Sequence, residues 1–264
     1  MRDVVQNHLL QVLALVAMDP PAGASADDAQ DKKAEVFRAM PPASPQHYVR
    51  GQYQGYTEVP GAAPGSTTET YVALRLEIDN WRWADVPVFL RAGKALPRKV
   101  TEVRLFLRRE PRLAFLSLPT RAGPNQIVLR IDPDPGLRLQ LSALAEQSWR
   151  PVHLDTSFAR ELGEPPEPYE RLLHAAIVGY HQLFAREDSV EETWRIVQPL
   201  LDHPPDVRLY LFGSWGPRRR KPWSTATRAG SSRGCPRRAE PNGPLSPRAA
   251  YRGPATASIC VSGW

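Results

Sequence analysis

The sequence predicts an α+β fold built around an antiparallel sheet. Apolar residues recur at helical spacing near the start of the chain, and again after residue 168. Between these regions, segments of alternating apolar and polar residues follow one another with short connections. Helices, then strands, then helices are typical of α+β proteins, and short connections between sequential strands favour antiparallel pairing.

The composition is that of an ordinary soluble protein. The 264 residues are 42% hydrophobic and 23% charged, and they suffice for one domain with a real core or for two small ones. No apolar run is long enough to span a membrane. The N-terminus also lacks a basic segment followed by an apolar core and a cleavage site. We therefore expect a cytoplasmic protein.

The net charge of +6 is unevenly distributed along the chain. Residues 218–264 hold ten of the 34 Lys and Arg residues but only one of the 28 Asp and Glu residues. This tail is therefore strongly basic, whereas residues 1–217 carry a small negative charge. Both cysteines, Cys235 and Cys260, also lie in the tail, and two isolated cysteines define neither a metal site nor a disulfide framework.

The segment Arg2–Met18 has the pattern of an amphipathic helix with one buried face. The residues of that face are Val5, Leu9, Val12, Leu13 and Val16. Asp3 stands where an N-cap is expected, with Gln6 three residues later as in a capping box. His8 lies near the edge of the apolar face, where partial burial could tune it as a base. By the alternative interpretation, Asp3 is only a cap and His8 is only a core histidine.

The remaining elements follow in order along the chain. A second helix is expected over Asp27–Ala39, with Val36 and Phe37 facing inward. The expected strands are Tyr48–Tyr53, Val72–Asp79, Val86–Arg91, Thr101–Arg109, Ile127–Ile131 and Leu137–Leu141. Pro87 suggests an edge strand or a strand start. Two helices follow, over Tyr169–Phe184 and from a capping box at Ser189–Glu192 to Leu201.

Eight short motifs carry a family resemblance. They are Arg2-Asp3-x-x-Gln6-Asn7-His8-Leu9, Gly51-Gln52-Tyr53, Ser66–Tyr71, Asn80-x-Arg82-Trp83-x-x-Val86-Pro87, Leu90–Lys94, Pro168–Leu172, Glu192-x-Trp194-Arg195-Ile196 and Gly213–Pro217. Over residues 2–217, and in this order, they resemble glucose-6-phosphate dehydrogenase. The resemblance implies the C-terminal domain of that family, a large, mainly antiparallel sheet with helices packed on one side. It also implies that two subunits pair sheet to sheet in a homodimer.

The resemblance also implies a reaction and a set of site residues. The family oxidises glucose 6-phosphate to 6-phosphogluconolactone with NADP, in the pentose phosphate pathway. His8 matches the catalytic histidine that takes the proton of the 1-hydroxyl, and Asp3 matches an aspartate that contacts the sugar. Lys94 matches a lysine that binds the substrate, as expected for a phosphate that needs cations. Lys99 is either a second cationic contact or a solvated loop lysine, and the two interpretations are about equal.

The fold implied by the resemblance predicts a geometry for these residues. His8 and Lys94 are expected to line one pocket, with Asp3 at its rim, and to be separated by the length of a phosphosugar. A general base must reach the proton that it removes, so the distance between the two side chains is set by the substrate.

Four further positions differ from the family pattern or carry uncertain roles. Arg91, Arg104 and Arg130 match positions that hold a second, structural NADP in some relatives, but arginines on solvent-facing strand positions are common and this site is not transferred. Asp132 falls where relatives carry a glutamine that touches the substrate. A carboxylate there is expected to repel a phosphosugar and to weaken its binding.

The main NADP site is missing from the sequence. No strand is followed by the glycine-rich turn and helix that hold a dinucleotide. Gly51-Gln-Tyr-Gln-Gly55 lacks the spacing and the following helix. The sequence begins in the middle of the family pattern, so we expect a C-terminal fragment that is inactive alone. The alternative is a non-catalytic module that binds a sugar phosphate or pairs with another subunit.

The tail after Pro217 does not resemble the family. Residues 218–264 are rich in Arg, Pro, Gly and Ser and show no periodicity. They read like a GC-rich gene translated in the wrong frame. A nucleic-acid-binding arm is the rival interpretation, but the charges are scattered among prolines. We expect a disordered tail that is dispensable for folding. The expected partners are thus glucose 6-phosphate and a second subunit, with no nucleic acid, membrane or metal.

Overall fold

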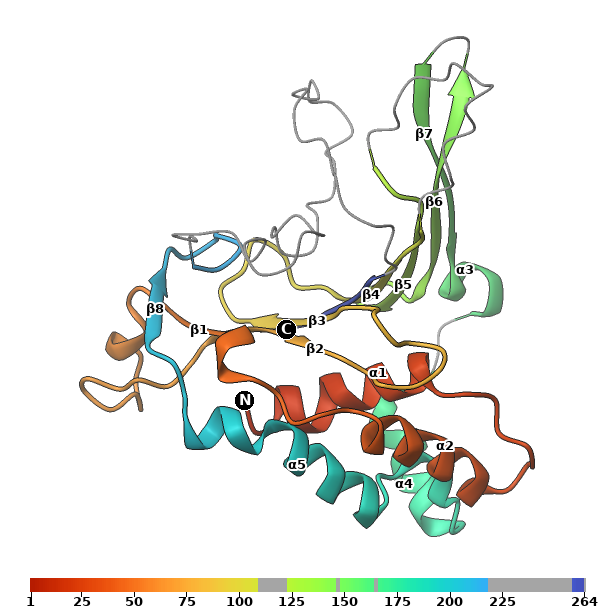
Figure 1. Cartoon of the computed structure of the whole chain (residues 1–264), viewed down its shortest axis with the longest axis horizontal. Helices are drawn as coiled ribbons and strands as arrows, with labels where there is room; N and C mark the ends of the chain where they lie inside the picture. Colours follow the sequence, from red (N-terminus) through yellow and green to blue (C-terminus); the bar gives the residue numbers. More distant parts are fainter. Residues whose placement is uncertain (109–122, 146–147, 164–165, 218–257, 264) are drawn as a thin grey trace.

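The computed structural model describes residues 1–108, 123–145, 148–163, 166–217 and 258–263. These residues form one curved nine-stranded sheet (Figure 1). Helices lie against one face of the half of the sheet that holds the N-terminal strands. The strand order is β7-β6-β5-β4-β9-β3-β2-β1-β8. The predicted α+β class and the placement of helices on one side are therefore confirmed.

The strands are β1 (Tyr48–Tyr53), β2 (Tyr71–Leu76), β3 (Val88–Gly93), β4 (Thr101–Phe106), β5 (Gln126–Asp132), β6 (Gly136–Ala145), β7 (Ser148–Ser157), β8 (Val207–Tyr210) and β9 (Ser258–Gly263). Most neighbours pair antiparallel, as predicted, but β8 is parallel to β1 and β9 is parallel to β3. The sequence did not predict β7, β8 or β9. Arg109, the expected end of β4, lies outside the described residues.

One expectation about the strands is confirmed and one needs correction. β3 begins directly after Pro87, as predicted for a strand start, and it lies inside the sheet between β2 and β9. The tail was expected to be disordered throughout, yet Ser258–Gly263 forms β9 between β3 and β4. A strand without apolar alternation can still join a sheet, because backbone groups alone form the ladder.

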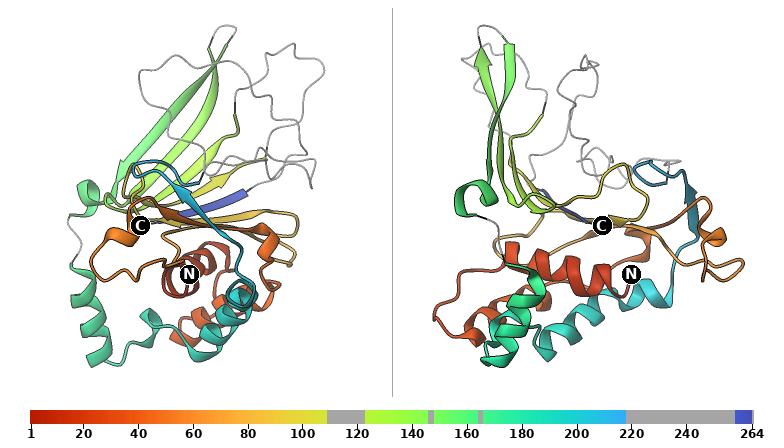
Figure 2. Two further views of the ribbon diagram at one scale, coloured as in Figure 1. Left: turned by 90° about the vertical axis from the view of Figure 1, so that its left-hand side faces the viewer. Right: turned by 180° about the vertical axis from the view of Figure 1, so that it is seen from behind.

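The longer helices are the π-helix η1 (Val4–Leu9), α1 (Leu10–Ala17), α2 (Ala26–Arg38), α3 (Phe158–Leu162), α4 (Pro168–Ile177) and α5 (Glu187–Asp202). Three short 3₁₀ turns are η2 (Pro45–His47), η3 (Tyr56–Glu58) and η4 (His181–Leu183). Figure 2 shows α1, α2 and α5 in one layer beneath β1–β3. The predicted second helix, with Val36 and Phe37 buried, is confirmed as α2.

The core lies between this helical layer and the sheet. Its largest fully buried side chains are Val5, Leu9, Leu10, Leu13, Phe37, Met40, Leu74, Ile78, Leu90, Ile196 and Leu200. Each such burial stabilises the fold by about 1.5–3 kcal/mol. Val12 and Val16 were expected on this face but are only partly buried. The first turn is π-helical, and its wider turn rotates the buried face toward Ala14 and Ala17.

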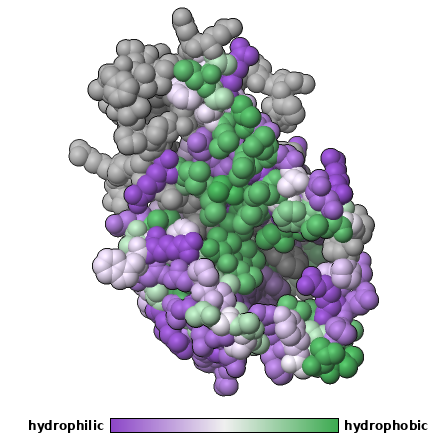
Figure 3. Space-filling model, turned by 90° about the vertical axis from the view of Figure 1, so that its right-hand side faces the viewer, coloured by the Kyte–Doolittle hydropathy of each residue, from purple (hydrophilic) through white to green (hydrophobic). Residues whose placement is uncertain are grey.

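The apolar face of the sheet continues beyond the helices. In the strand register, Val103 lies opposite Leu129, and Ile127 lies opposite Leu139, which lies opposite Leu154. Because residues two apart point to the same face, an apolar surface extends over β5, β6 and β7. Among the described residues, the layer of α1, α2 and α5 does not extend over β6 and β7, and Figure 3 shows a broad hydrophobic area on this side of the molecule.

The predicted helix over Tyr169–Phe184 is shorter than expected and its apolar face is not buried. α4 ends at Ile177, and a 3₁₀ turn follows at His181–Leu183. Leu173 is 64% exposed and Ile177 is 84% exposed, and only Ala175 of this helix is buried. The periodicity correctly identified a helix, but it could not show whether a neighbour would cover the helix.

The turn at Asn80–Trp83 closes the end of α1. The Asn80 side chain accepts hydrogen bonds from the backbone N–H groups of Arg82 and Trp83, and the Trp83 indole donates to the Ala17 carbonyl at 2.8 Å. Trp83 packs against the core, whereas Trp81 is fully exposed.

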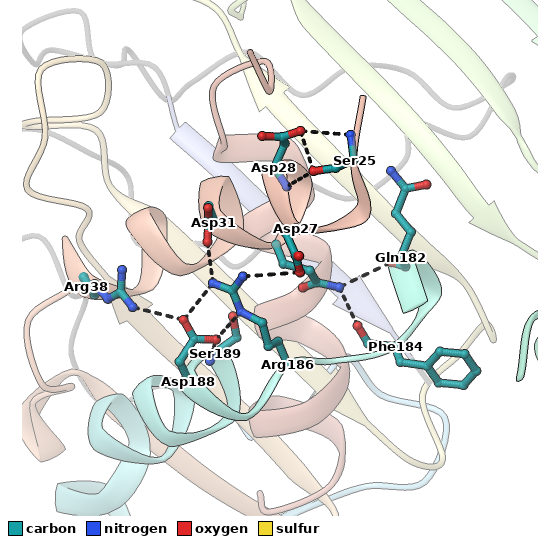
Figure 4. A network of polar contacts seen from close by, with 11 residues as sticks. Ser25, Asp27, Asp28, Asp31, Arg38, Gln182, Phe184, Arg186, Asp188 and Ser189 are labelled. Carbon is teal, nitrogen blue, oxygen red and sulfur yellow. Dashed lines mark hydrogen bonds and ion pairs between the residues drawn. The ribbon is translucent and has the colours of Figure 1, made fainter. Parts of the chain in front are cut away.

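Polar contacts join α5 to α2 (Figure 4). Arg186 donates to Asp31 Oδ1 at 2.6 Å and to Asp188 Oδ1 at 2.8 Å, and Arg38 donates to Asp188 Oδ2 at 3.0 Å. The predicted capping box at Ser189 does not form, because α5 begins two residues earlier and Ser189 is fully buried within it. The ion pairs therefore fix the start of α5.

Candidate functional site

The π-helical turn brings Asp3 and His8 together. The backbone N–H of His8 donates to the Asp3 carbonyl at 3.3 Å, a hydrogen bond five residues apart. Residues five apart do not face each other in an α-helix, but the wider π turn aligns them. The Asp3 carboxylate lies 3.3 Å from His8 Nε2, and both side chains are substantially exposed. The sequence placed His8 near the buried face, whereas the structure exposes it.

The expected capping box at Asp3 and Gln6 is wrong. Asp3 has helical backbone angles and its side chain caps no N–H group. Gln6 is buried instead, and its amide donates to Thr193 Oγ1 at 2.8 Å. This hydrogen bond ties η1 to α5. The Asp3 carboxylate pairs with His8 of the same turn instead of capping the helix.

Lys94 follows β3 on a loop whose backbone is held at several points. Its N–H donates to the Thr70 carbonyl and its carbonyl accepts from the Tyr210 hydroxyl, each at 2.8 Å. Ala95 has a left-handed φ of 53°, and its carbonyl accepts from Gly213 N–H at 2.8 Å. The Lys94 side chain itself is exposed. A cation on a fixed backbone is therefore available to an anion.

The glycines of two motifs make room for one aromatic ring. A Cβ on Gly93 would lie 2.8 Å from Tyr71 Cδ2, and a Cβ on Gly216 would lie 2.4 Å from Tyr71 Cε2. The ring of Tyr71 thus fills the space between the loop after β3 and the segment after β8. The glycine before Lys94 permits a close approach, as expected, and the approaching group is this ring.

The first helix and the Lys94 loop meet at Glu69 and Thr70. The Met1 amino group lies 3.0 Å from Glu69 Oε1, while Thr70 accepts the hydrogen bond of Lys94. Arg50 also binds Glu69, at 2.9 Å. Arg50 was interpreted as a surface arginine, but it is largely buried in this structural role. The start of η1 therefore lies beside Lys94. A common pocket for His8 and Lys94 stays a prediction.

Lys99 and Asp132 are brought together by the sheet. Thr101, at the start of β4, pairs with Asp132, at the end of β5. Lys99 Nζ lies 3.5 Å from Asp132 Oδ2, and both side chains are exposed. A carboxylate therefore compensates the charge of Lys99. Both interpretations of Lys99 remain open. A phosphate that bound Lys99 would have to compete with Asp132 for its ammonium group.

The three arginines considered for a second NADP site have other contacts. Arg104 binds Glu102 at 2.7 Å, and Arg130 lies 2.9 Å from Asp134 and 3.0 Å from Asp155. Arg91 is buried, and its guanidinium stacks 5.0 Å from the Trp215 ring centroid. Burial lowers the pKa of Arg91. These contacts give the arginines internal roles in the sheet.

The Gly51–Gly55 turn does not have the geometry of a dinucleotide-binding turn. β1 runs into the turn at Gly55 and a three-residue 3₁₀ turn, and it pairs antiparallel with β2. A dinucleotide instead needs a strand, a glycine turn and a helix N-terminus. No group of three or more potential metal ligands occurs among the residues that the structure describes. Within the same ranges, no helix is long and apolar enough to cross a membrane.

The mainly antiparallel sheet with helices on one side, together with the eight motifs, is the arrangement expected for the C-terminal domain of one enzyme family. The family model for "Glucose-6-phosphate dehydrogenase, C-terminal domain" matches residues 1–229, twelve residues beyond the expected limit at Pro217. The chain belongs to the glucose-6-phosphate dehydrogenase family, whose members are NADP-dependent oxidoreductases. The resemblance predicted from the motifs is therefore confirmed.

Individual relatives agree with this assignment. Glucose-6-phosphate 1-dehydrogenase 1 of Mycobacterium tuberculosis is 72% identical over 217 residues, covering 82% of this chain and 47% of that protein. The crystal structure of the Mycobacterium avium enzyme superposes with a TM-score of 0.76 at 71% identity, over 82% of this chain and 47% of that one. The chain spans about half the length of the curated relatives it matches.

A more distant matching structure contains a sugar phosphate. It is described as glucose-6-phosphate dehydrogenase in complex with its substrate glucose-6-phosphate, and it is 31% identical with a TM-score of 0.74. The match covers 82% of this chain and 48% of that one. The sugar-phosphate complex is a property of that protein.

The contacts that position His8 and Lys94 have no signal in the local sequence. The Asp3–His8 contact depends on a π turn, which has no periodic signal in the sequence. Tyr210 lies three residues before the Gly213–Pro217 motif, and no local pattern connects it to Lys94. The aromatic residues around that motif were the only available indication of close packing.

Proposed function

We propose that this chain supplies the substrate side of glucose 6-phosphate oxidation. Lys94 binds the phosphate, His8 accepts the proton of the 1-hydroxyl, and Asp3, whose carboxylate lies 3.3 Å from His8 Nε2, contacts the sugar. The contacts of Met1 with Glu69 and of the Lys94 backbone with Thr70 support the proposal, because they link the chain before η1 to the Lys94 loop through two adjacent residues. An ammonium group suits a phosphate, and an imidazole suits proton transfer near neutral pH.

We assign no described residue to the binding of NADP, the hydride acceptor. The proposal therefore separates binding from turnover: the chain binds glucose 6-phosphate but does not reduce NADP alone. Cytoplasmic location is part of the same proposal, supported by the ordinary soluble composition. Cell fractionation with detection of the chain tests this part.

Binding is tested by titrating glucose 6-phosphate into the whole chain in a calorimeter. Lys94→Ala should weaken binding about tenfold or more, because a charge-assisted contact to phosphate is lost. Lys32→Ala is the matched control, since Lys32 is paired with Glu35 on α2. Absence of binding, or equal losses in both variants, would refute the site. Any NADP reduction that His8→Ala abolishes would refute the separation of binding from turnover.

A specific observation favours subunit pairing as a second function. Among the described residues, the layer of α1, α2 and α5 leaves the apolar face of β6 and β7 exposed, and large exposed apolar surfaces mark interaction sites. Leu154 on this face is 55% exposed. We propose that two copies pair through this face. Its continuity with the sheet supports a sheet-to-sheet contact.

Sedimentation of two charge variants tests the pairing. Leu154→Glu places a carboxylate on the apolar face and should yield monomers. His153→Glu changes the adjacent residue, whose side chain points to the opposite face of β7, and should leave the dimer intact. A monomeric unmodified chain, or dimers in both variants, would contradict the proposed interface.

A further inference from the structure

The segment after β8 lies directly over the loop that carries Lys94. We call Tyr210–Gly216 the aromatic strap. In Figure 1 the strand β8 stands beside β1, and the chain then turns toward the loop after β3. Tyr210 contacts Lys94, Gly213 contacts Ala95, and Trp215 stacks on Arg91. The strap thus contacts the chain at Arg91 on β3, at Lys94 itself and at the next residue, Ala95.

The central contact is a relay of hydrogen bonds that ends on Lys94. Tyr53 N–H donates to Thr70 Oγ1 at 2.9 Å, Thr70 Oγ1 lies 3.0 Å from the Tyr210 hydroxyl, and that hydroxyl donates to the Lys94 carbonyl at 2.8 Å. Tyr210 is 3% exposed. Burial raises the pKa of its hydroxyl, which therefore remains a donor at neutral pH.

The strap also fixes the direction of the chain beyond Lys94. Ala95 adopts a left-handed φ of 53°, which is unfavourable for a residue with a Cβ. The hydrogen bond from Gly213 to the Ala95 carbonyl compensates for that cost. Tyr210 and Gly213 together therefore bind both carbonyls at the turn. A free loop would leave the ammonium group of Lys94 in many positions.

We infer that Tyr210 is a positioning residue for Lys94, acting through the backbone of the loop. This inference rests on the proposed function, in which Lys94 binds the phosphate of the substrate. Tyr210 touches no substrate atom in this arrangement. Its effect is to restrict the loop before the ligand arrives, so that less conformational freedom is lost on binding.

The test measures glucose 6-phosphate binding in a double-mutant cycle on the whole chain. Tyr210→Phe should weaken binding about five- to tenfold, the loss typical of one buried hydrogen bond. In a Lys94→Ala background the same change should have no further effect, because the positioned group is already absent. A purely structural role would instead reduce binding equally in both backgrounds. The matched control is Tyr53→Phe, whose ring packs edge to face on Tyr210, and it should bind normally.

The outcomes separate the inference from the proposed function. If Lys94→Ala does not weaken binding, the proposed site itself fails. If Lys94→Ala weakens binding but Tyr210→Phe does not, only the positioning role is overturned. Should Tyr210→Phe not fold, Trp215→Leu loosens the strap from its other end. That variant should weaken binding two- to threefold or so, again only when Lys94 is present.

Discussion

At the scale of single residues, function depends on whether a charge is free or paired. Lys94 is exposed on a fixed backbone, whereas Lys99 shares its charge with Asp132. The sequence identified all three residues, since the motifs and the departure at Asp132 are visible in it. The pairing of Lys99 with Asp132 depended on the register of β4 and β5. That register joins Thr101 to Asp132, 31 positions apart in the chain, and it has no local signal.

Removal of the carboxylate at Asp132 should improve binding. Asp132→Gln frees Lys99 and removes a negative charge near the phosphate, so glucose 6-phosphate affinity should rise roughly three- to tenfold. Calorimetric titration at low and moderate salt measures the change. Asp202→Asn removes the same charge at the end of α5 and serves as control. An equal gain from both variants would attribute the effect to net charge alone.

At the scale of elements, helices α2 and α5 are joined by ion pairs as well as by apolar contacts. Thr193 and Ile196 on α5 are fully buried, while Arg186 and Asp188 lie at its start. The hydrogen bond from Arg186 lowers the pKa of the Asp188 carboxyl, and partial burial opposes this shift. The contact therefore stabilises the charged form of Asp188.

The lowered pKa predicts a direction for the pH dependence of stability. A carboxyl with a depressed pKa in the folded state adds stability above its unfolded pKa, near 4 or so, and loses it as pH falls through the folded value. Arg186→Gln should thus lower the free energy of unfolding by about 1 kcal/mol at neutral pH and by less below pH of about 3. Urea unfolding across this pH range provides the measurement.

The control for this prediction keeps the same change of charge. Lys32→Gln removes a cation whose partner, Glu35, lies on the same helix. Its loss should leave the unfolding free energy nearly unchanged at any pH, because an exposed pair is screened by solvent. A pH dependence that Arg186→Gln leaves unaltered would show that Asp188 does not contribute through this pair.

At the scale of the whole molecule, the described sheet is completed by a strand from the tail. β9 lies between β3 and β4, so both strands depend on it for their ladder hydrogen bonds. The expectation of a tail dispensable for folding conflicts with this position. Truncation after residue 257 should therefore lower the midpoint of thermal unfolding.

A point variant tests whether the ladder hydrogen bonds of β9, and not the presence of the tail alone, stabilise the fold. Val261→Pro cannot donate to the ladder in a central strand, and it should lower the midpoint about as much as the truncation. Calorimetric scans of the two variants and the unmodified chain give the comparison. Unchanged midpoints in both variants would support the original expectation and exclude a structural role for β9.

The sequence by itself determined the family, the α+β class and the identity of His8, Asp3, Lys94 and Lys99 as candidates. These features follow from local patterns, namely periodicity and short motifs whose residues are close in the chain. Only the tertiary structure decided which candidates have partners, because those contacts join distant segments. Tyr210 reaches Lys94 across 116 positions, and the uncovered apolar faces appear only once the neighbours of each element are known.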